Sequence, residues 1–318
     1  MIVALAGGVG AARMLGGLVQ VVPPEQVTAV VNTGDDTVMH GLYISPDLDT
    51  VTYTLAGMIN PATGWGLRDE TWAAMEELRR YSDGRLAWFN LGDRDLGTHL
   101  YRTSRQREGA PLSTVAAEIA ARWEVGVRLL PMSDDRVETR VVLDEGADGR
   151  EVGFQEYFVG ARHDVPIRAV RLAGIETARP APGVLEAVAG AATVVICPSN
   201  PVVSIGPVLA VPGIAEAVTA RRADVVAVSP IIAGRALKGP ADRMLAELGH
   251  ESSVVGVARM WAPYAATLVI DTADAGMAAQ VEAEGMRAVV GPTVMSGPDQ
   301  AAALARLALG ATAGRGPV

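Results

Sequence analysis

Residues 2–22 of the chain read IVALAGGVGAARMLGGLVQVV, and this stretch decides the fold. Residues 2–6 form a short, unbroken apolar run, which is typical of a parallel strand buried on both faces. The glycine-rich residues 7–10 follow directly, residues 11–22 can form a helix, and residues 27–32 are a second apolar run. The pattern predicts a unit of strand, glycine turn, helix and strand, whose right-handed crossover places both strand ends at one edge.

The same pattern returns later, at residues 193–196, 225–228 and 254–257, and a further strand is predicted at residues 125–130. Each of the first three runs ends near a loop rich in Pro, Gly, Ser or Asn, and we expect these loops at the same edge. The sequence therefore predicts an α/β fold, with a Rossmann-like parallel sheet that is covered by helices on both faces.

The middle of the chain has a different pattern. Residues 69–81 and 112–123 resemble amphipathic helices, whereas residues 137–143 and 151–159 alternate like antiparallel strands. We therefore expect an insertion over the sheet edge, formed by a helical lid and a β-hairpin. The predicted organisation is a nucleotide-binding core at residues 1–53 and 129–310 with a hairpin at about 137–159, a mainly helical insertion at 54–128, and a flexible tail at 311–318.

Composition and charge exclude several classes of protein. The formal net charge of −9 argues against a broad nucleic-acid surface, which needs an excess of basic residues. The lone cysteine, Cys197, rules out an internal disulfide and favours a reduced, cytoplasmic setting. No apolar run is long enough for a membrane span, and the four histidines have no zinc-like spacing. An exposed or hydrogen-bonded histidine is the simpler interpretation of each.

The glycine turn is a candidate phosphate site. At Gly7, Gly8 and Gly10 the missing Cβ atoms let the backbone approach a phosphate, and amides at the helix start point at the negative charge. We predict that these glycines, with Val9 and Arg13, bind a nucleotide. The alternatives are a glycine turn that only joins strand to helix and a solvated surface arginine.

Four aspartates follow the second predicted strand, in the segments NTGDD (residues 32–36) and SPDLDT (residues 45–50). Carboxylates beside a diphosphate are natural Mg²⁺ ligands, and one of them can orient or deprotonate a hydroxyl. We predict metal ligands at Asp35, Asp36 and Asp47 and catalytic groups at Asp36, Asp47 and Asp49. The sequence does not show which aspartate has which role. Helix capping is the alternative interpretation for each aspartate.

Polar residues mark three further loops. Asn90, Asp93 and Arg94 belong to a charged cluster that either closes the site, with Arg94 available to a phosphate, or forms a surface turn with internal ion pairs. Two proline-rich loops follow later strands, and their polar groups are of the kind that read a base, a ribose or a phosphate. The predicted nucleotide-binding residues in these loops are Ser199, Asn200, Ser204, Ser229 and Pro230.

Taken in order, these motifs resemble one family, the 2-phospho-L-lactate transferases of coenzyme F420 biosynthesis, including their actinobacterial phosphoenolpyruvate transferase branch. The resemblance runs from residue 2 to about residue 309. Each motif alone is common, but the occurrence of all of them in this order is specific to the family. The motifs that carry it are residues 7–10, 32–36, 44–50, 91–95, 130–135, 198–201 and 229–232.

The resemblance implies a reaction. The ribityl hydroxyl of the deazaflavin Fo would attack the phosphoryl group of a guanylylated phospho-acid, releasing GMP and forming F420-0 or dehydro-F420-0. The acid is 2-phospholactate, phosphoenolpyruvate or 3-phosphoglycerate. Mg²⁺ dependence, a homodimer and deazaflavin contacts at Asp49, Asn90, Asp93 and Arg94 are further implications, although Asn90 departs from relatives that carry a lysine. Mg²⁺ and fixed amides would absorb the charge that develops as GMP leaves.

Two other functions compete with this one. Non-catalytic regulators of the same superfamily that bind sugar nucleotides share the glycine loop and the Asp35–Asp36 pair, but they lack residues 44–50 and 91–95 in this form. A nicotinamide-dependent oxidoreductase would need an acidic residue at the end of the second strand, where Asn32 and Thr33 stand. We therefore rank the transferase first and the regulator second.

Overall fold

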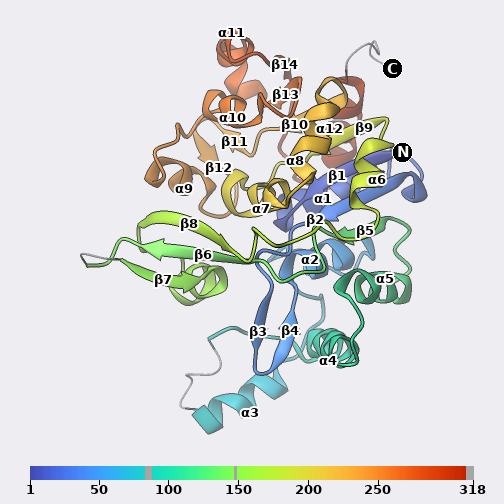
Figure 1. Cartoon of the computed structure of the whole chain (residues 1–318), viewed down its shortest axis with the longest axis vertical. Helices are drawn as coiled ribbons and strands as arrows, with labels where there is room; N and C mark the ends of the chain where they lie inside the picture. Colours follow the sequence, from blue (N-terminus) through green and yellow to red (C-terminus); the bar gives the residue numbers. More distant parts are fainter. Residues whose placement is uncertain (83–87, 147–148, 313–318) are drawn as a thin grey trace.

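A parallel sheet forms the centre of the computed structural model, which describes residues 1–82, 88–146 and 149–312 (Figure 1). Its seven strands lie in the order β14-β13-β10-β9-β1-β2-β5, and every neighbouring pair is parallel. The predicted α/β fold with a Rossmann-like sheet is confirmed. The strands are β1 (Ile2–Ala6), β2 (Val27–Val31), β5 (Arg128–Pro131), β9 (Thr193–Ile196), β10 (Val225–Val228), β13 (Thr267–Ile270) and β14 (Arg287–Val290).

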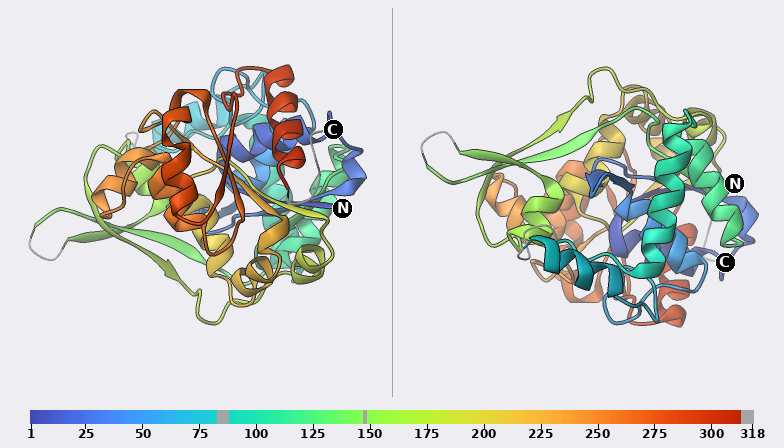
Figure 2. Two further views of the ribbon diagram at one scale, coloured as in Figure 1. Left: turned by 90° about the horizontal axis from the view of Figure 1, so that it is seen from above. Right: turned by 90° about the horizontal axis from the view of Figure 1, so that it is seen from below.

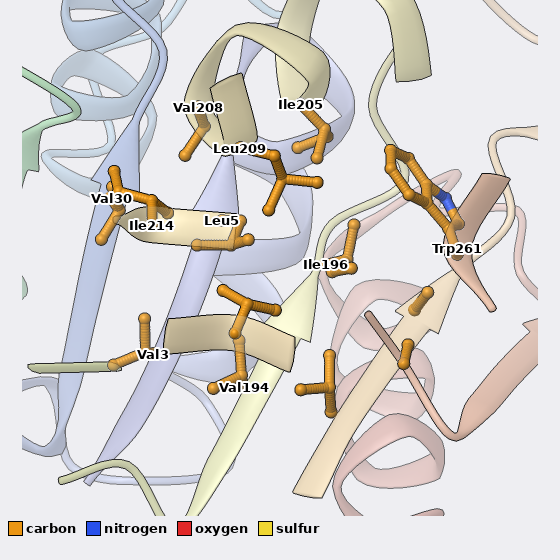
Figure 3. Close-up of a cluster of buried hydrophobic side chains, with 14 of the residues drawn as sticks. Val3, Leu5, Val30, Val194, Ile196, Ile205, Val208, Leu209, Ile214 and Trp261 are labelled. Atoms are coloured by element: carbon orange, nitrogen blue, oxygen red, sulfur yellow. The ribbon is translucent and has the colours of Figure 1, made fainter. Parts of the chain in front are cut away.

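Alternate residues of β1 face two separate cores. Val3 and Leu5 belong to one apolar cluster, and Ala4 belongs to the other, because successive side chains of a strand point to opposite faces. Figure 3 shows the first cluster, in which Leu5 faces helical side chains above the sheet. Helices on this face are α6 (Val184–Ala189), α7 (Gly206–Ala210), α8 (Ile214–Ala220), α9 (Ala241–Glu247), α10 (Val254–Trp261) and α11 (Ala278–Ala283).

The opposite face of the sheet is covered by four helices, and two of them, α1 and α2, also carry residues of the candidate site. They are α1 (Gly8–Leu18), α2 (Pro46–Leu55), α5 (Leu112–Arg122) and α12 (Pro298–Gly310), and each contributes buried apolar residues to the second cluster. Helix α1 packs against both α2 and α12. The predicted strand, glycine turn and helix at the N-terminus is therefore present, with the helix starting and ending a few residues earlier than expected.

The strand predicted at residues 254–257 is wrong, because these residues begin helix α10. Ser253 caps this helix: its hydroxyl oxygen accepts hydrogen bonds from the amides of Val255 and Gly256, both at 3.1 Å. A short apolar run does not distinguish a strand from a buried helix, and the serine in front of it was the signal for the helix. The true strands of this region, β13 and β14, were not predicted.

The insertions lie beyond the carboxyl edge of the sheet. A short hairpin of β3 (Thr37–Met39) and β4 (Leu42–Ile44) leads to α2, and helices α3 (Ala73–Ser82) and α4 (Asp93–Arg107) follow it. Seen from below in Figure 2, α3, α4 and α5 lie across this side of the molecule.

The predicted β-hairpin is part of a three-stranded antiparallel sheet in the order β7-β6-β8, which projects from the side of the molecule (Figure 2). The second predicted strand is shorter than expected, since residues Glu156–Gly160 form a π-helical turn. The strands are β6 (Glu138–Leu143), β7 (Arg150–Gly153) and β8 (Ile167–Ala173).

Short elements complete the chain. The flexible tail was predicted to begin at residue 311, but Ala311 is buried and its carbonyl accepts a hydrogen bond from the Thr267 hydroxyl. The remainder of that prediction, residues 313–318, lies outside the described residues. The other elements are the helical turns Pro24–Gln26, Pro201–Ile205, Arg222–Asp224 and Thr272–Met277, and the strands β11 (Ile231–Ile232) and β12 (Arg235–Ala236).

Within the described residues, no single helix is long and apolar enough to cross a membrane. The segments Pro201–Ala210 and Ile214–Ala220 reach that length together, with a bend of 92° between them. Both contribute buried residues to the first apolar cluster, which accounts for their composition.

Candidate active site

The glycine turn lies at the carboxyl edge of the sheet, between β1 and α1. Gly7 precedes the helix, and the Gly8 amide donates a hydrogen bond of 2.8 Å to Oδ1 of Asp47. A Cβ atom on Gly7 would lie 2.8 Å from Cβ of Ser204 and 2.9 Å from Oδ2 of Asp47. Glycine at this position therefore allows the turn, helix α2 and the loop after β9 to meet.

Gly10 makes a second close approach. A Cβ atom there would lie 2.1 Å from the carbonyl oxygen of Pro198, far inside van der Waals contact. The loop after β9 is thus packed directly on the backbone of α1. This contact places Ser199 at the turn, and the Ser199 hydroxyl is buried without a hydrogen-bond partner among the described residues.

Asn32, at the end of β2, ties the site together. Its amide nitrogen donates to Oδ2 of Asp47 at 2.9 Å and to the Val203 carbonyl at 3.3 Å, and its amide oxygen accepts from the Gly34 amide at 2.9 Å. Burial raises the pKa of Asp47 to about 6, although the hydrogen bonds from Asn32 and Gly8 oppose this shift. Asp47 is a buried carboxyl group that tethers the glycine turn.

We expect Asp47→Asn to change how stability depends on pH. The pKa of Asp47 is about 6 in the folded chain, against an ordinary 3.8, so the folded state binds this proton more tightly than the unfolded state. The resulting stabilisation is complete below the ordinary pKa and is lost as the pH rises through the folded value. Relative to the variant, the wild-type free energy of unfolding should fall by roughly 3 kcal/mol across this window.

Urea unfolding of both proteins at a series of pH values, in buffer without divalent cations, measures this difference. Parallel pH profiles for the wild type and Asp47→Asn would contradict the expected titration of Asp47.

Asp35 and Asp36 lie just beyond the end of β2, beside Asp47. Burial raises the pKa of both carboxyl groups well above the ordinary value; Asp47 adds to the shift of Asp35, and the Ser45 hydroxyl, which donates to Asp36 at 2.7 Å, opposes that of Asp36. Oδ1 of each aspartate is buried without a hydrogen-bond partner among the described residues. Two unpartnered carboxylate oxygens form a donor set that a hard divalent cation fits.

Asp49 lies two residues after Asp47 in α2. Unlike Asp47, it forms a buried ion pair with Arg102. The Arg102 guanidinium binds both oxygens of Asp49: Nη1 donates to Oδ2 at 3.1 Å and Nη2 donates to Oδ1. Only 2% of the Arg102 side chain is exposed. Although burial acts to lower the pKa of Arg102, its attraction to Asp49 raises it, so the guanidinium stays charged.

The Asp49–Arg102 pair continues into a buried network. His99 Nδ1 lies 3.2 Å from Nη1 of Arg102, and His99 Nε2 lies 3.3 Å from Oδ2 of Asp95. The Tyr53 hydroxyl donates to Oδ1 of Asp95 at 2.6 Å. The neighbouring His99 and the hydrogen bond from the Tyr53 hydroxyl lower the pKa of Asp95 against the opposing effect of burial. The network joins one face of α4 to one face of α2.

This network was not predicted, although the spacing of its residues is visible in the sequence. Asp95, His99 and Arg102 recur at i, i+4 and i+7 on α4, and Asp49 and Tyr53 recur at i and i+4 on α2, so each set shares one helix face. No such rule identifies which two helices pack together.

Asp49, Asp95 and His99 also form a group that could hold a metal ion, since their ligand atoms lie within 4.8 Å of one another. Arg102 already balances the charge of Asp49, and a dication there would face the guanidinium. No comparable grouping of the predicted ligands Asp35, Asp36 and Asp47 is found among the described residues, so their joint assignment stays a prediction.

A cavity of about 210 Å³ opens beside Asp49, between α2, α4 and the segment that joins α2 to α3. Asp49, His99 and Asp95 form a polar side, and Asn90 lies on the rim, where it accepts a hydrogen bond of 2.8 Å from Arg79. The remaining walls are largely aromatic and apolar, with Trp65, Trp72, Phe89 and Leu91 among the lining residues.

Two of the predicted ligand contacts have structural roles instead of facing this cavity. Both oxygens of Asp93 are bound at the start of α3, by the Thr71 hydroxyl at 2.6 Å and by the amides of Ala73 and Ala74 at 2.9 Å. The Thr71 hydrogen bond is the main reason that the pKa of Asp93 lies below its ordinary value. Arg94 donates to the Arg68 carbonyl at 3.0 Å. Neither residue lines the cavity.

Several of the predicted nucleotide-binding residues make hydrogen bonds within the fold, and their role toward a nucleotide stays a prediction. The Asn200 side-chain oxygen caps the helical turn after it by accepting from the Val202 amide at 2.9 Å, and the Ser229 hydroxyl closes its own turn, which includes Pro230, by bonding the amide and carbonyl of Ile231. Arg13 donates to the Met295 carbonyl at 3.2 Å. Ser199 and Ser204 remain beside the glycine turn.

Comparisons with known proteins give a consistent result. Residues 2–293 match the family described as 2-phospho-L-lactate transferase CofD. The chain is 49% identical over 312 residues to a phosphoenolpyruvate transferase of Streptomyces griseus, covering 97% of each chain. It is 45% identical over 321 residues to the phosphoenolpyruvate transferase of Mycolicibacterium smegmatis, also covering 97% of each. Protein BH3568 from Bacillus halodurans shares the fold, with a TM-score of 0.61 and 19% identity over 97% of this chain and 98% of that one.

Proposed function

Because the chain belongs to the 2-phospho-L-lactate transferase family and is a phospho-acid transferase of coenzyme F420 biosynthesis, we propose that it transfers a phosphoenolpyruvyl group to the deazaflavin Fo. The donor is the guanosine diphosphate adduct of the acid, and GMP is released. Phosphoenolpyruvate is preferred to 2-phospholactate as the acid because relatives at 45% to 49% identity are named phosphoenolpyruvate transferases. The product is then dehydro-F420-0, whereas the lactyl donor would form F420-0.

One observation carries this proposal: the first turn of α2 links a phosphate-type turn to an aromatic cavity. Asp47 holds the Gly8 amide, and Asp49, two residues later, lines the cavity. A donor diphosphate at the glycine turn and an acceptor in the cavity would therefore meet at this helix start. Such proximity is what a transfer between two bound substrates needs.

The cavity suits the flat ring system of a deazaflavin. Trp65, Trp72 and Phe89 offer faces for stacking, and Asn90 offers a hydrogen-bonding amide at the rim. Asp49 would orient the ribityl hydroxyl and accept its proton as the hydroxyl oxygen forms a bond to phosphorus. The bond from phosphorus to the GMP oxygen breaks in the same transfer, and GMP leaves with that electron pair.

Asp35 and Asp36 fit Mg²⁺, since each has a buried carboxylate oxygen without a partner among the described residues. Bound there, Mg²⁺ would neutralise charge on the diphosphate. Asp47, the third predicted ligand, holds the glycine turn through Gly8 and completes the acidic wall. We place the metal here because Arg102 already occupies the carboxylate of Asp49. A homodimer and a cytoplasmic location belong to the same proposal.

Incubation of the purified protein with Fo, Mg²⁺ and each guanylylated acid tests the function. We expect GMP release with the enolpyruvyl donor and a deazaflavin product whose mass retains the carbon–carbon double bond. Preference for the lactyl donor would overturn the choice of acid. No product with any donor, together with tight binding of a UDP-sugar, would overturn the transferase in favour of the regulator.

Trp65→Ala should raise the KM for Fo about tenfold through lost stacking, with a smaller change in kcat. Trp65 lines the cavity and is 53% exposed, so its removal leaves the fold intact. Tyr101→Ala is the matched control, because Tyr101 is 41% exposed and does not line the cavity. Steady-state kinetics with Fo as the varied substrate measure both variants, and equal KM values would argue against this acceptor site.

A further inference from the structure

Lys238 is chemically singular in this chain. The sequence holds 27 basic residues of the lysine and arginine types, and every one except residue 238 is arginine. Arginine forms planar, bidentate contacts, whereas the ammonium of lysine is a compact point charge with three donors. Position 238 is therefore the one site in the sequence where a lysine ammonium stands in place of a guanidinium.

The position of Lys238 is the second observation. The residue follows β12, in the loop beyond β10, and its Nζ donates a hydrogen bond of 2.8 Å to the Thr63 carbonyl. Thr63 belongs to the segment between α2 and α3 that also carries Trp65. Residues far apart in the sequence therefore meet at one point.

That point adjoins the glycine turn. The Cβ position of Gly64 lies 3.0 Å from Cγ1 of Val9, in the turn, and 3.3 Å from Nζ of Lys238. Only Gly64 separates the ammonium from the turn that follows β1, and Lys238 is exposed to solvent. Thr63 uses one of its three donors, which leaves two for a ligand.

The charges around the turn create a need for such a cation. Asp47 lies against the turn and accepts the Gly8 amide, and Asp35 and Asp36 lie near enough to Asp47 that, besides burial, its charge raises the pKa of each. Mg²⁺ held by Asp35 and Asp36 would neutralise part of the charge of a diphosphate on this side, and a positive charge on the opposite side of the turn would balance the rest. Lys238 supplies that charge from across the turn.

We propose that Lys238 binds the diphosphate of the nucleotide donor and, through the Thr63 carbonyl, holds the segment of residues 60–66 closed over the acceptor cavity. This proposal rests on the proposed function and extends it. Lys238 would connect the donor site at the glycine turn with the acceptor site in the cavity. Bound donor would order the segment that carries Trp65, and the donor would therefore raise the affinity for the acceptor. By linkage, the acceptor would raise the affinity for the donor by the same factor.

The test compares three variants of the full-length protein. Lys238→Met removes the charge, Lys238→Arg keeps the charge but changes its geometry, and Arg235→Met removes a neighbouring exposed cation as the matched control. Titration calorimetry measures GDP binding with Mg²⁺, and fluorescence measures Fo binding with and without GDP. Circular dichroism melts confirm that each variant is folded.

We expect Lys238→Met to weaken GDP binding at least about tenfold and to abolish the gain in Fo affinity that GDP produces. Fo binding alone should weaken by a smaller factor, because the contact with the Thr63 carbonyl is lost. Lys238→Arg should lie in between, and Arg235→Met should match the wild type. Unchanged GDP binding in folded Lys238→Met would overturn the role of Lys238 but leave the proposed function standing. A wild-type protein that binds neither GDP nor Fo would overturn the proposed function and this inference with it.

Discussion

Asp49→Asn is expected to lower turnover by about 100-fold or more, because a carboxylate that positions or accepts a proton is worth this much in catalysis. The change also removes the charge that faces Arg102, whose guanidinium is buried. An uncompensated buried charge destabilises a protein by about 3–5 kcal/mol. The variant should therefore be both slow and less stable.

The two effects can be separated. Arg102→Met removes the bidentate partner of the buried Asp49, whereas the double variant Asp49→Asn with Arg102→Met removes both charges and should recover part of the lost stability without recovering turnover. Asp93→Asn is the matched control, because Asp93 caps α3 and does not line the cavity, so turnover should stay close to wild type. Steady-state kinetics and urea unfolding measure the set, and near-normal turnover of Asp49→Asn would contradict its catalytic role.

Gly10→Ala is expected to destabilise the protein and to weaken nucleotide binding. Inside a helix this substitution ordinarily stabilises by about 0.5–1 kcal/mol. Here the new Cβ atom would lie 2.1 Å from the Pro198 carbonyl oxygen, which belongs to the backbone and moves only if the loop after β9 moves. We expect a loss of about 1–3 kcal/mol or more, as for other overpacked sites.

Gly16→Ala provides the comparison within the same helix. A Cβ atom on Gly16 would lie 3.8 Å from Cγ2 of Thr54, which is an ordinary contact, so this variant should be as stable as the wild type or slightly more stable. Urea unfolding and GDP titration report both. Equal stability of the two variants would show that the loop yields easily and that Gly10 does not set its position.

Much of the sheet could be predicted because its strands are short apolar runs. Strands β1, β2, β9 and β10 were found for this reason, and β5 was placed three residues early at its start. The errors share one cause. A four-residue apolar run fits a strand and a buried helix equally well, and only the neighbouring turn chemistry, such as Ser253 before α10, separates them.

The candidate site was predictable where the chain itself brings residues together and less so where packing does. The glycine turn follows β1 and the Asp35–Asp36 pair follows β2, and the carboxyl ends of these neighbouring parallel strands must share an edge. The partnership of Asp49 with Arg102 depends on how α4 docks on α2, which no local pattern encodes. Asp93, for which the resemblance implies a deazaflavin contact, accepts hydrogen bonds from the amides of Ala73 and Ala74 at the start of α3, a partnership that the charges of its loop do not reveal.

The order of the strands bears on how the chain is made. Strand β1 lies between β2 and β9, which are residues 27–31 and 193–196, so one side of the first strand finds its partner early and the other side very late. At a ribosome speed of about 5–20 residues per second, the second partner emerges roughly ten to thirty seconds after the first. For that time the nascent chain carries an apolar strand with one open edge, the kind of surface that chaperones shield from aggregation.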